Sequence, residues 1–223
     1  MTIDAGEGDN SIVRNGRNVS VNSGTGNDYF SLSGNDSPGS QGSQILDAGG
    51  NNFITLSGNY HSINVAGNNT IYGAPVNNKI TVGGGNDLIS LSSSYNIIDA
   101  GDGLNTIYAA GKSNSITAGA NGDLISISGF AKTISEGNTI NAGAGNNTIY
   151  SGDINSGGSF NVINSGAGAD LISLFGSANT VNAGDGANTI YAASIRNKIT
   201  TGADNDSITI IMENTINANG NEI

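Results

Sequence analysis

An 18-residue repeat runs along the chain and constrains its fold more than any other feature. The segment 83–91, GGGNDLISL, returns as 101–109, GDGLNTIYA, and again as 166–174, GAGADLISL. A repeat at fixed period predicts a solenoid, in which each copy forms one coil and buries its apolar face only by stacking on its neighbours. An Asp or Asn marks the end of each glycine turn, at Asn10, Asp28, Asn52, Asn69, Asp87, Asn105, Asp123, Asn147, Asp170, Asn188 and Asp206.

Each repeat divides into two halves of nine residues. The first half is a glycine turn and a strand with alternating apolar residues, such as Ile89 and Leu91, and the second is a polar turn and another alternating strand, such as Ile98 and Ala100. Alternation with period two turns one face of each strand inward. We therefore predict an all-β fold, a two-sheet parallel β-solenoid of about eleven 18-residue coils that fills residues 1–223 as a single domain.

Two further features refine this prediction. A three-sided helix of hexapeptides also uses 18 residues per coil, but it requires an apolar residue at every sixth position. Asn86 and Ser92, six and twelve residues after Ile80, are polar, so this fold is excluded. The longer repeats carry insertions at the second turn, in 34–43, 129–137 and 152–160. Parallel β connections favour a right-handed coil, so we expect that hand.

The composition excludes several function classes. The net charge is −11, from 18 acidic and 7 basic residues, so the chain repels nucleic acid and anionic membranes and we expect neither as a partner. No apolar run is long enough to insert into a membrane, and the absence of cysteine rules out disulfides. The first residues are already repeat sequence with no visible cleavable signal peptide, so we expect export by another route or as part of a longer protein.

Catalytic machinery is not visible in the sequence. The chain has a single histidine, His61, its seven Lys and Arg residues are scattered, and its Gly-x-Gly segments are not followed by a helix. We therefore predict that the protein is not an enzyme and has no catalytic residues.

The Gly-x-Gly-x-Asp-x-apolar-x nonapeptide in these segments resembles the RTX repeat, also called the hemolysin-type calcium-binding repeat. The resemblance implies a parallel β-roll whose glycine turns hold Ca²⁺ through Asp carboxylates and backbone carbonyls. This chain departs from that pattern in two ways. The second nonapeptide of each coil has lost the glycine turn, and Asp alternates with Asn in the first, being kept at Asp28, Asp87, Asp123, Asp170 and Asp206.

The alternation predicts a column that needs no metal. Stacked Asp residues about 4.8 Å apart would repel one another, whereas Asn between them spaces the charges and can donate to the carboxylates. The second turn predicts a pure asparagine ladder, formed by Asn78, Asn96, Asn114, Asn138, Asn161, Asn179, Asn197 and Asn214. Toward the N-terminus we expect His61, Gln44 and Val19 in the equivalent places.

Calcium remains an alternative to this metal-free column. An acid three residues before the column position could pair with a column Asp of a neighbouring coil, which gives Glu7 with Asp28, Asp87 with Asp102, and Asp170 with Asp185. Turn carbonyls would complete an oxygen-only Ca²⁺ site. A cofactor is therefore not required, and Ca²⁺ is the one candidate.

The outward faces offer candidate surfaces for a partner. On the first sheet large residues alternate by coil, and we expect an apolar stripe formed by Tyr72, Leu88, Tyr108, Leu124, Tyr150, Leu171 and Tyr191. Such a stripe indicates a protein partner or self-assembly, and the solenoid ends, which show no polar caps, are a second place for self-assembly. The second sheet presents rows of Thr that resemble ice-binding solenoids but are interrupted by Lys79, Ile97 and Lys198.

These observations favour a non-enzymatic structural or adhesive repeat module of an exported bacterial protein, extracellular or at the cell surface. A calcium-binding module that folds on Ca²⁺ is the alternative, and an ice-binding solenoid is a further one.

Overall fold

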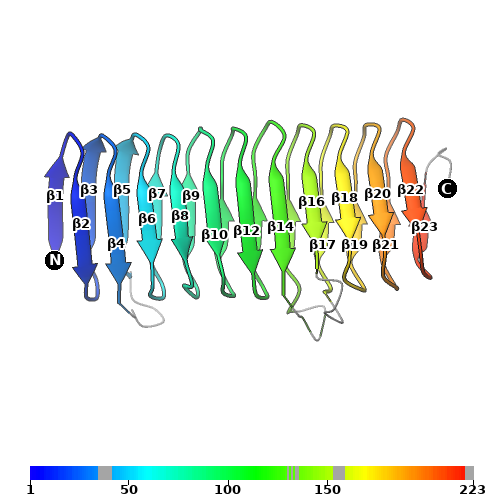
Figure 1. Ribbon diagram of the computed structural model, residues 1–223, viewed down its shortest axis with the longest axis horizontal. Coiled ribbons are helices and arrows are strands. Elements are labelled where there is room, and N and C mark those ends of the chain that lie inside the picture. Colours follow the sequence, from blue (N-terminus) through cyan, green and yellow to red (C-terminus); the bar gives the residue numbers. More distant parts are fainter. Residues whose placement is uncertain (35–41, 130, 132, 134–135, 153–158, 219–223) are drawn as a thin grey trace.

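The computed structural model describes residues 1–34, 42–129, 131, 133, 136–152 and 159–218, and it is a two-sheet parallel β-solenoid, as the repeat predicts. Figure 1 shows the coils stacked side by side into a rod, with the N-terminus at one end and the C-terminus at the other. The described residues contain no helix long and apolar enough to cross a membrane.

The odd-numbered strands form a 12-stranded sheet and the even-numbered strands an 11-stranded sheet. The first consists of β1 (Thr2–Gly6), β3 (Ser20–Thr25), β5 (Gln44–Gly49), β7 (Ser62–Val65), β9 (Lys79–Val82), β11 (Ile97–Asp99), β13 (Ser115–Thr117), β15 (Thr139–Asn141), β17 (Val162–Asn164), β19 (Thr180–Asn182), β21 (Lys198–Thr200) and β23 (Thr215–Asn217). The second consists of β2 (Ser11–Asn15), β4 (Tyr29–Ser33), β6 (Phe53–Leu56), β8 (Thr70–Gly73), β10 (Leu88–Leu91), β12 (Thr106–Ala110), β14 (Leu124–Ser128), β16 (Thr148–Ser151), β18 (Leu171–Leu174), β20 (Thr189–Ala192) and β22 (Ser207–Ile210).

The core is a thin layer of stacked aliphatic side chains between the two sheets. Ile89 pairs with Ile71 of the preceding coil and with Ile107 of the following coil, and all three are fully buried. A fully buried Ile contributes about 1.5–3 kcal/mol, so this column repeated along the rod supplies most of the driving force. The second inward position of each odd strand is smaller, for example Ala100, which keeps the sheets close together.

The two edges of the rod turn in different ways. The edge that joins each odd strand to the next even strand, here called the glycine-turn edge, lies at the top of Figure 1. Gly103 on this edge has φ +128, and a Cβ there would overlap the carbonyl oxygen of Gly85 in the preceding coil. The other edge, here called the opposite edge, uses non-glycine residues with positive φ, such as Tyr95 (φ 63) and Ala178 (φ 60).

The insertions fall where the sequence places them. They lie between β4 and β5, between β14 and β15, and between β16 and β17, all on the opposite edge. Parts of the predicted insertions, at 35–41, 130, 132, 134–135 and 153–158, lie outside the described residues.

Candidate functional site

A column of buried Asp and Asn side chains runs along the glycine-turn edge, just before each even strand. From Asp28 to Asp206, Oδ1 of each column residue accepts a hydrogen bond from the preceding coil. The Asn69 N–H donates to Asp87 Oδ1 at 2.7 Å, and the Asp87 N–H donates to Asn105 Oδ1 at 3.1 Å. The same backbone bond recurs from Asn10 to Asp206, except that Asn52 reaches Asn69 through its side-chain amide.

The amide nitrogens of the column Asn residues mainly bind the turn of their own coil. Asn69 Nδ2 donates to the Gly67 carbonyl at 2.8 Å, and Asn188 Nδ2 donates to the Gly186 carbonyl at 2.9 Å. Both also reach the carboxylate of the next coil, Asn69 to Asp87 Oδ1 at 3.0 Å and Asn188 to Asp206 Oδ1 at 2.9 Å. The predicted amide-to-carboxylate bonds therefore exist, but the backbone N–H is the general donor between coils.

Three of the column Asp residues lack this second interaction. Oδ2 of Asp87, Asp123 and Asp170 is buried and has no hydrogen-bond partner. Asp and Asn have the same shape and their Oδ1 atoms make the same bond, so the second oxygen takes the place of the amide nitrogen and faces the turn carbonyls. Oδ2, a hydrogen-bond acceptor, thus faces carbonyl oxygens that are also acceptors. Protonation of the carboxylate or a bound cation would remove this repulsion.

The titration of these groups reflects the same mismatch. Burial raises the pKa of Asp123 to about 6, against the hydrogen bonds from Asn105, which lower it. Burial also raises the pKa of Asp87 and the pKa of Asp170 above their ordinary value. From Asp28 to Asp206 each column Oδ1 therefore has a hydrogen-bond donor, but burial disfavours the charged form of Asp87, Asp123 and Asp170.

A carboxyl pair that the sequence analysis did not identify lies near the N-terminal end of the column. Burial raises the pKa of Asp47 to about 6, and its contact with the carboxylate of Asp28 raises it further, as in two acids that share a proton. Burial acts in the same sense on Asp28, but hydrogen bonds, first from Ser23 at 2.6 Å, outweigh it and lower its pKa. Asp47 and Ser23 occupy inward positions of β5 and β3 that carry Ala or Val in most other coils, which was the available signal.

The turn acids of the predicted calcium pairs bond to the coil that follows their own. Glu7 accepts hydrogen bonds from Thr25, which lower its pKa, and it lies close enough to Asp28 to feel that charge. Oδ1 of Asp102 accepts from the Ala120 N–H at 2.7 Å, and the charge of Asp102 acts on Asp123.

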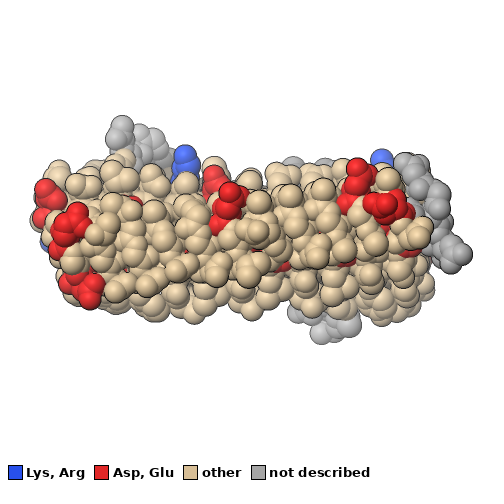
Figure 2. Space-filling view, turned by 90° about the horizontal axis from the view of Figure 1, so that it is seen from above, with Lys and Arg blue, Asp and Glu red and all other residues tan. Residues whose placement is uncertain are grey.

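Asp185 Oδ1 likewise accepts from the Ala203 N–H at 2.9 Å. These bonds direct Asp102 and Asp185 away from Asp87 and Asp170, so they give no support to those two pairings, which stay predictions. Figure 2, which looks onto this edge, shows the acidic side chains in separate groups along a mostly uncharged surface.

The opposite edge carries the predicted asparagine ladder. Eight Asn side chains, all buried except the half-buried Asn214, each accept through Oδ1 the backbone N–H of the preceding coil: Asn78, Asn96, Asn114, Asn138, Asn161, Asn179, Asn197 and Asn214. Asn179 shows the full pattern, because its Nδ2 also donates to the Gly176 carbonyl at 2.8 Å and to Asn197 Oδ1 at 3.0 Å. Both atoms of this amide are therefore used.

The ladder changes character toward the N-terminus, and one predicted substitute is wrong. His61 and Val19 hold ladder positions, as predicted, but Ser43 and not Gln44 holds the place between them. The Val19 N–H donates to Ser43 Oγ at 3.3 Å, while Gln44 pairs with outward residues of β3 and β7. Ser43 lies two residues before the inward Ile45, as Asn96 lies two residues before Ile98, so the ladder spacing is unbroken here and the prediction of Gln44 was wrong by one residue.

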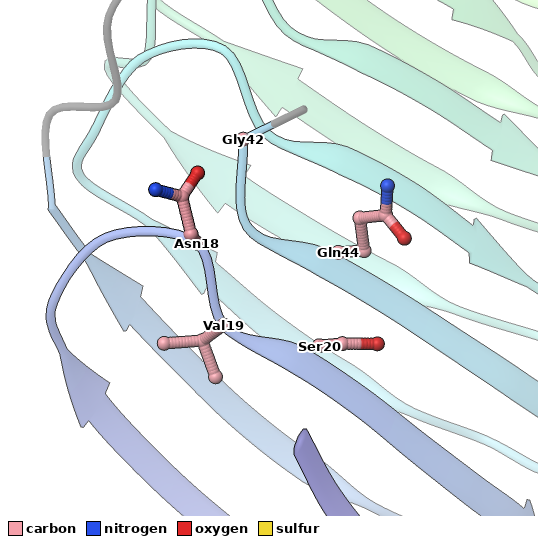
Figure 3. A pocket seen from close by; sticks show the side chains of 5 residues that line it. All are labelled: Asn18, Val19, Ser20, Gly42 and Gln44. Carbon is pink, nitrogen blue, oxygen red and sulfur yellow. The ribbon is translucent and has the colours of Figure 1, made fainter. Parts of the chain in front are cut away.

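A pocket of about 190 Å³ opens where the ladder ends, lined by Asn18, Val19, Ser20, Gly42 and Gln44. Figure 3 shows Asn18, Val19 and Ser20 on one coil beside Gly42 and Gln44 on the next. No acid or base lines it, so it offers shape and amide groups but no means of moving a proton.

A third ladder, missed in the sequence, runs along the exposed tip of the glycine turns. Asn27 N–H donates to Asp9 Oδ1 at 2.8 Å, Asn86 N–H to Asn68 Oδ1 at 2.7 Å, and Leu104 N–H to Asn86 Oδ1 at 2.9 Å. Its bonds run from each coil to the one before it, opposite in direction to those of the buried column. The signal was an Asn or Asp directly before the column residue in the first five coils.

The predicted apolar stripe on the 11-stranded sheet is resolved into two rows. Leu88, Leu124 and Leu171 share one row with Thr residues, whereas the Tyr residues share the other row with Ser. Tyr72, Tyr108, Tyr150 and Leu171 are exposed, and Leu88, Leu124 and Tyr191 are partly buried. All seven predicted residues point outward, but the large residues of neighbouring coils lie in different rows, so they are diagonal neighbours and do not form one continuous stripe.

The donor atoms that this structure offers are of the type that Ca²⁺ binds. The unpartnered carboxylate oxygens and the turn carbonyls are the hard oxygen ligands that Ca²⁺ prefers. Within the described ranges, however, no three His, Cys, Asp or Glu residues gather closely enough to hold a metal by side chains alone. A cation here would depend on backbone carbonyls, with Asp87, Asp123 and Asp170, or the Asp28–Asp47 pair, as its side-chain ligands.

Comparison with known protein families finds a match for the repeat. The family model of the RTX calcium-binding nonapeptide repeat (four copies) matches residues 64–98, 135–153 and 155–190. Neither the curated proteins nor the solved structures gave a match.

Proposed function

We propose that this chain, which carries RTX calcium-binding nonapeptide repeats folded as a β-solenoid, serves as a rigid, non-catalytic structural module of an exported bacterial protein. One observation carries the proposal. On both edges a backbone N–H of one coil binds a side-chain Oδ1 of the next, for example at Asn105 with Asp123 and at Asn96 with Asn114. These bonds join the coils without any external ligand.

The surface supports a structural role rather than catalysis. The described residues hold a single histidine and one ion pair, Lys112 with Glu136, at the opposite edge. Acid–base chemistry needs several titratable groups that converge on a pocket. The pocket of Figure 3 has none, a hollow beside β10 has only Asp87 and Tyr108, and one near the C-terminal end has only Arg196 and Glu213. RTX repeat proteins are typically secreted, which supports an exported module, and a rod is a suitable shape for a spacer between other parts of a protein.

The test is the shape of the protein without metal. Small-angle scattering and far-UV circular dichroism of the full chain in excess EDTA should give a β-rich rod of about 50 Å, as eleven coils at strand spacing require. A chain that is unfolded in EDTA and gains this shape only with Ca²⁺ would contradict a self-sufficient scaffold.

The unpartnered oxygens favour a second candidate, a module that folds alone but is stabilised by Ca²⁺. The ion would bind beside Asp87, Asp123 and Asp170, where each buried Oδ2 lacks a donor. Thermal unfolding should then move to higher temperature in Ca²⁺ than in Mg²⁺ or EDTA, because a ligand that binds only the folded state stabilises it. The matched control is the triple variant Asp87→Asn, Asp123→Asn, Asp170→Asn, whose amides should donate to the turn carbonyls and remove the shift.

The control distinguishes the two possible locations of the ion. If the triple variant keeps the full Ca²⁺ shift, the ion binds elsewhere, and the predicted pairs of Glu7, Asp102 and Asp185 become the sites to mutate. If wild type shows no shift, the calcium candidate is rejected and the metal-free scaffold remains.

A further inference from the structure

The outward face of the 11-stranded sheet, here called the Leu/Tyr face, is a checkerboard of large and small side chains. Strand register places Leu88 beside Thr106 in one row and Ser90 beside Tyr108 in the other. The large residues are Phe53, Tyr72, Leu88, Tyr108, Leu124, Tyr150, Leu171 and Tyr191, and the small residues between them are Thr55, Thr70, Ser90, Thr106, Ser126, Thr148, Ser173 and Thr189. From Tyr72 to Tyr191 every large side chain has small neighbours along its own row, whereas Phe53 stacks on Tyr29 of the preceding coil.

This face carries no charge, although the chain as a whole has a net charge of −11. None of the residues of β6 to β22 in the even sheet is Asp, Glu, Lys or Arg. The outward face of the odd sheet differs, because it presents Lys79, Asp99 and Lys198. Two copies that approach through the Leu/Tyr face bring together the side of the rod with the least repulsion.

The checkerboard is complementary to itself. A two-fold axis that runs along the rod between the two rows lays each row of one copy over the other row of the second copy. Leu88 then faces Ser90 of the second copy, and Tyr108 faces Thr106 of the second copy, so a large residue meets a small one in every coil. No shift along the rod is needed, because both rows have the same two-coil period and opposite phase.

We propose that the Leu/Tyr face is the interface of a homodimer in which two rods lie side by side. The eight coils of this face form a strip about 38 Å long and about 13 Å wide, which covers roughly 500 Å² on each copy, from coil spacing and strand length. About 1,000 Å² in total lies at the lower end of stable interfaces. Exposed tyrosines are favourable anchors for such a contact, and Tyr108 is 44% exposed.

The first test is the oligomeric state of the full chain by sedimentation velocity over a range of concentrations. We expect a monomer–dimer equilibrium in EDTA and in Ca²⁺ alike, since the interface contains no carboxylate. Leu124→Glu, which brings a charge into the strip, should weaken the dimer at least tenfold. The matched control Thr117→Glu places the same charge on the exposed face of β13 in the other sheet and should leave the dimer unchanged. A wild-type protein that stays monomeric overturns the proposal.

The second test separates a matched interface from a merely apolar one. Ser126 lies between Tyr108 and Tyr150 in its row, and Ser126→Tyr fills a hole while adding apolar area. We expect this variant to dimerise at least tenfold more weakly, because a large residue would meet a large residue. Stronger dimerisation of Ser126→Tyr, or equal loss in the Thr117→Glu control, would contradict the checkerboard fit. Circular dichroism confirms that each variant is folded.

Discussion

The glycine-turn edge and the opposite edge close with the same hydrogen bond but differ in the second atom of the ladder side chain. At the opposite edge, Asn179 accepts the Asn161 N–H through Oδ1, and its Nδ2 donates to the Gly176 carbonyl. At the glycine-turn edge, Asp123 accepts the Asn105 N–H through Oδ1, but its Oδ2 has no partner. Oδ1 therefore joins the coils, and the second atom decides whether an edge also responds to protons or cations.

The largest effect should come from removing both atoms at the opposite edge. Asn179→Leu keeps the number and branching of the side-chain heavy atoms, so it leaves the Asn161 N–H and the Gly176 carbonyl buried without partners rather than opening a cavity. We expect a loss of about 2–4 kcal/mol of unfolding free energy, measured by urea denaturation.

The control for that variant transfers the chemistry of one edge to the other. Asn179→Asp keeps Oδ1 and replaces only the donor, so it should lose stability at neutral pH and regain part of it in acid. A loss that is independent of pH would show that the second atom is not the difference between the edges.

The pH dependence of wild-type stability should follow the raised pKa values at the glycine-turn edge. Asp47 and Asp123 have pKa values of about 6 when folded, above the ordinary value, so they bind protons more tightly in the folded state. Their contribution is complete below the unfolded pKa of about 4 and is lost as pH rises through about 6. In EDTA the unfolding free energy should fall by about 1–2 kcal/mol between about pH 4.5 and 7, with solvent screening allowed for.

Below about pH 4 the lowered pKa values of Glu7 and Asp28 act in the opposite sense, so the gain should not continue into stronger acid. Urea denaturation at closely spaced pH values measures the curve. Stability that rises steadily from about pH 4.5 to 7 would mean that the column carboxylates are not held at a cost.

A single substitution should remove part of that cost. Asp123→Asn restores a donor toward the turn and eliminates the charge, so we expect about 1 kcal/mol of added stability near pH 7 and none near pH 4.5. Thermal unfolding at the two pH values measures it, and Asn147→Asp in the next coil is the matched reverse change, with the opposite sign expected.

The smallest effect concerns how the two edges turn. Ala178 sits at φ 60 directly before the ladder residue Asn179, whereas the positive-φ residue of the glycine-turn edge is a glycine such as Gly186. A left-handed alanine is strained, so Ala178→Gly should add about 0.5–1 kcal/mol. Tyr95→Gly in another coil tests whether the gain is general, and a loss in both would show that the side chains at these positions stabilise the turn.

Repeat period and alternation were sufficient to predict the coil, the two sheets, their inward faces and the Asn ladder, because a two-residue period and an 18-residue step leave one stacking register. The prediction was wrong at Gln44, because Ser43 is the residue that keeps the two-residue offset from the inward Ile45 and takes the ladder place.

The chemistry of the edges was less accessible from the sequence. The choice of the backbone N–H as the general donor, the direction of Asp102 toward Ala120, and the Asp28–Asp47 contact all depend on side-chain rotamers and on the rise between coils. The sequence repeat predicts which residues share an edge, but it does not predict which atom of each side chain makes the hydrogen bond.

The most direct test of the account compares two backbone amides in one sample by NMR-detected hydrogen exchange in EDTA near neutral pH. The Asn96 N–H binds Asn114 Oδ1 at the opposite edge, and the Asn105 N–H binds Asp123 Oδ1 at the glycine-turn edge. The account predicts that both amides are protected to a similar extent without metal, because Oδ1 makes the same bond at both edges. Fast exchange of the Asn105 amide that becomes slow only when Ca²⁺ is added would contradict it.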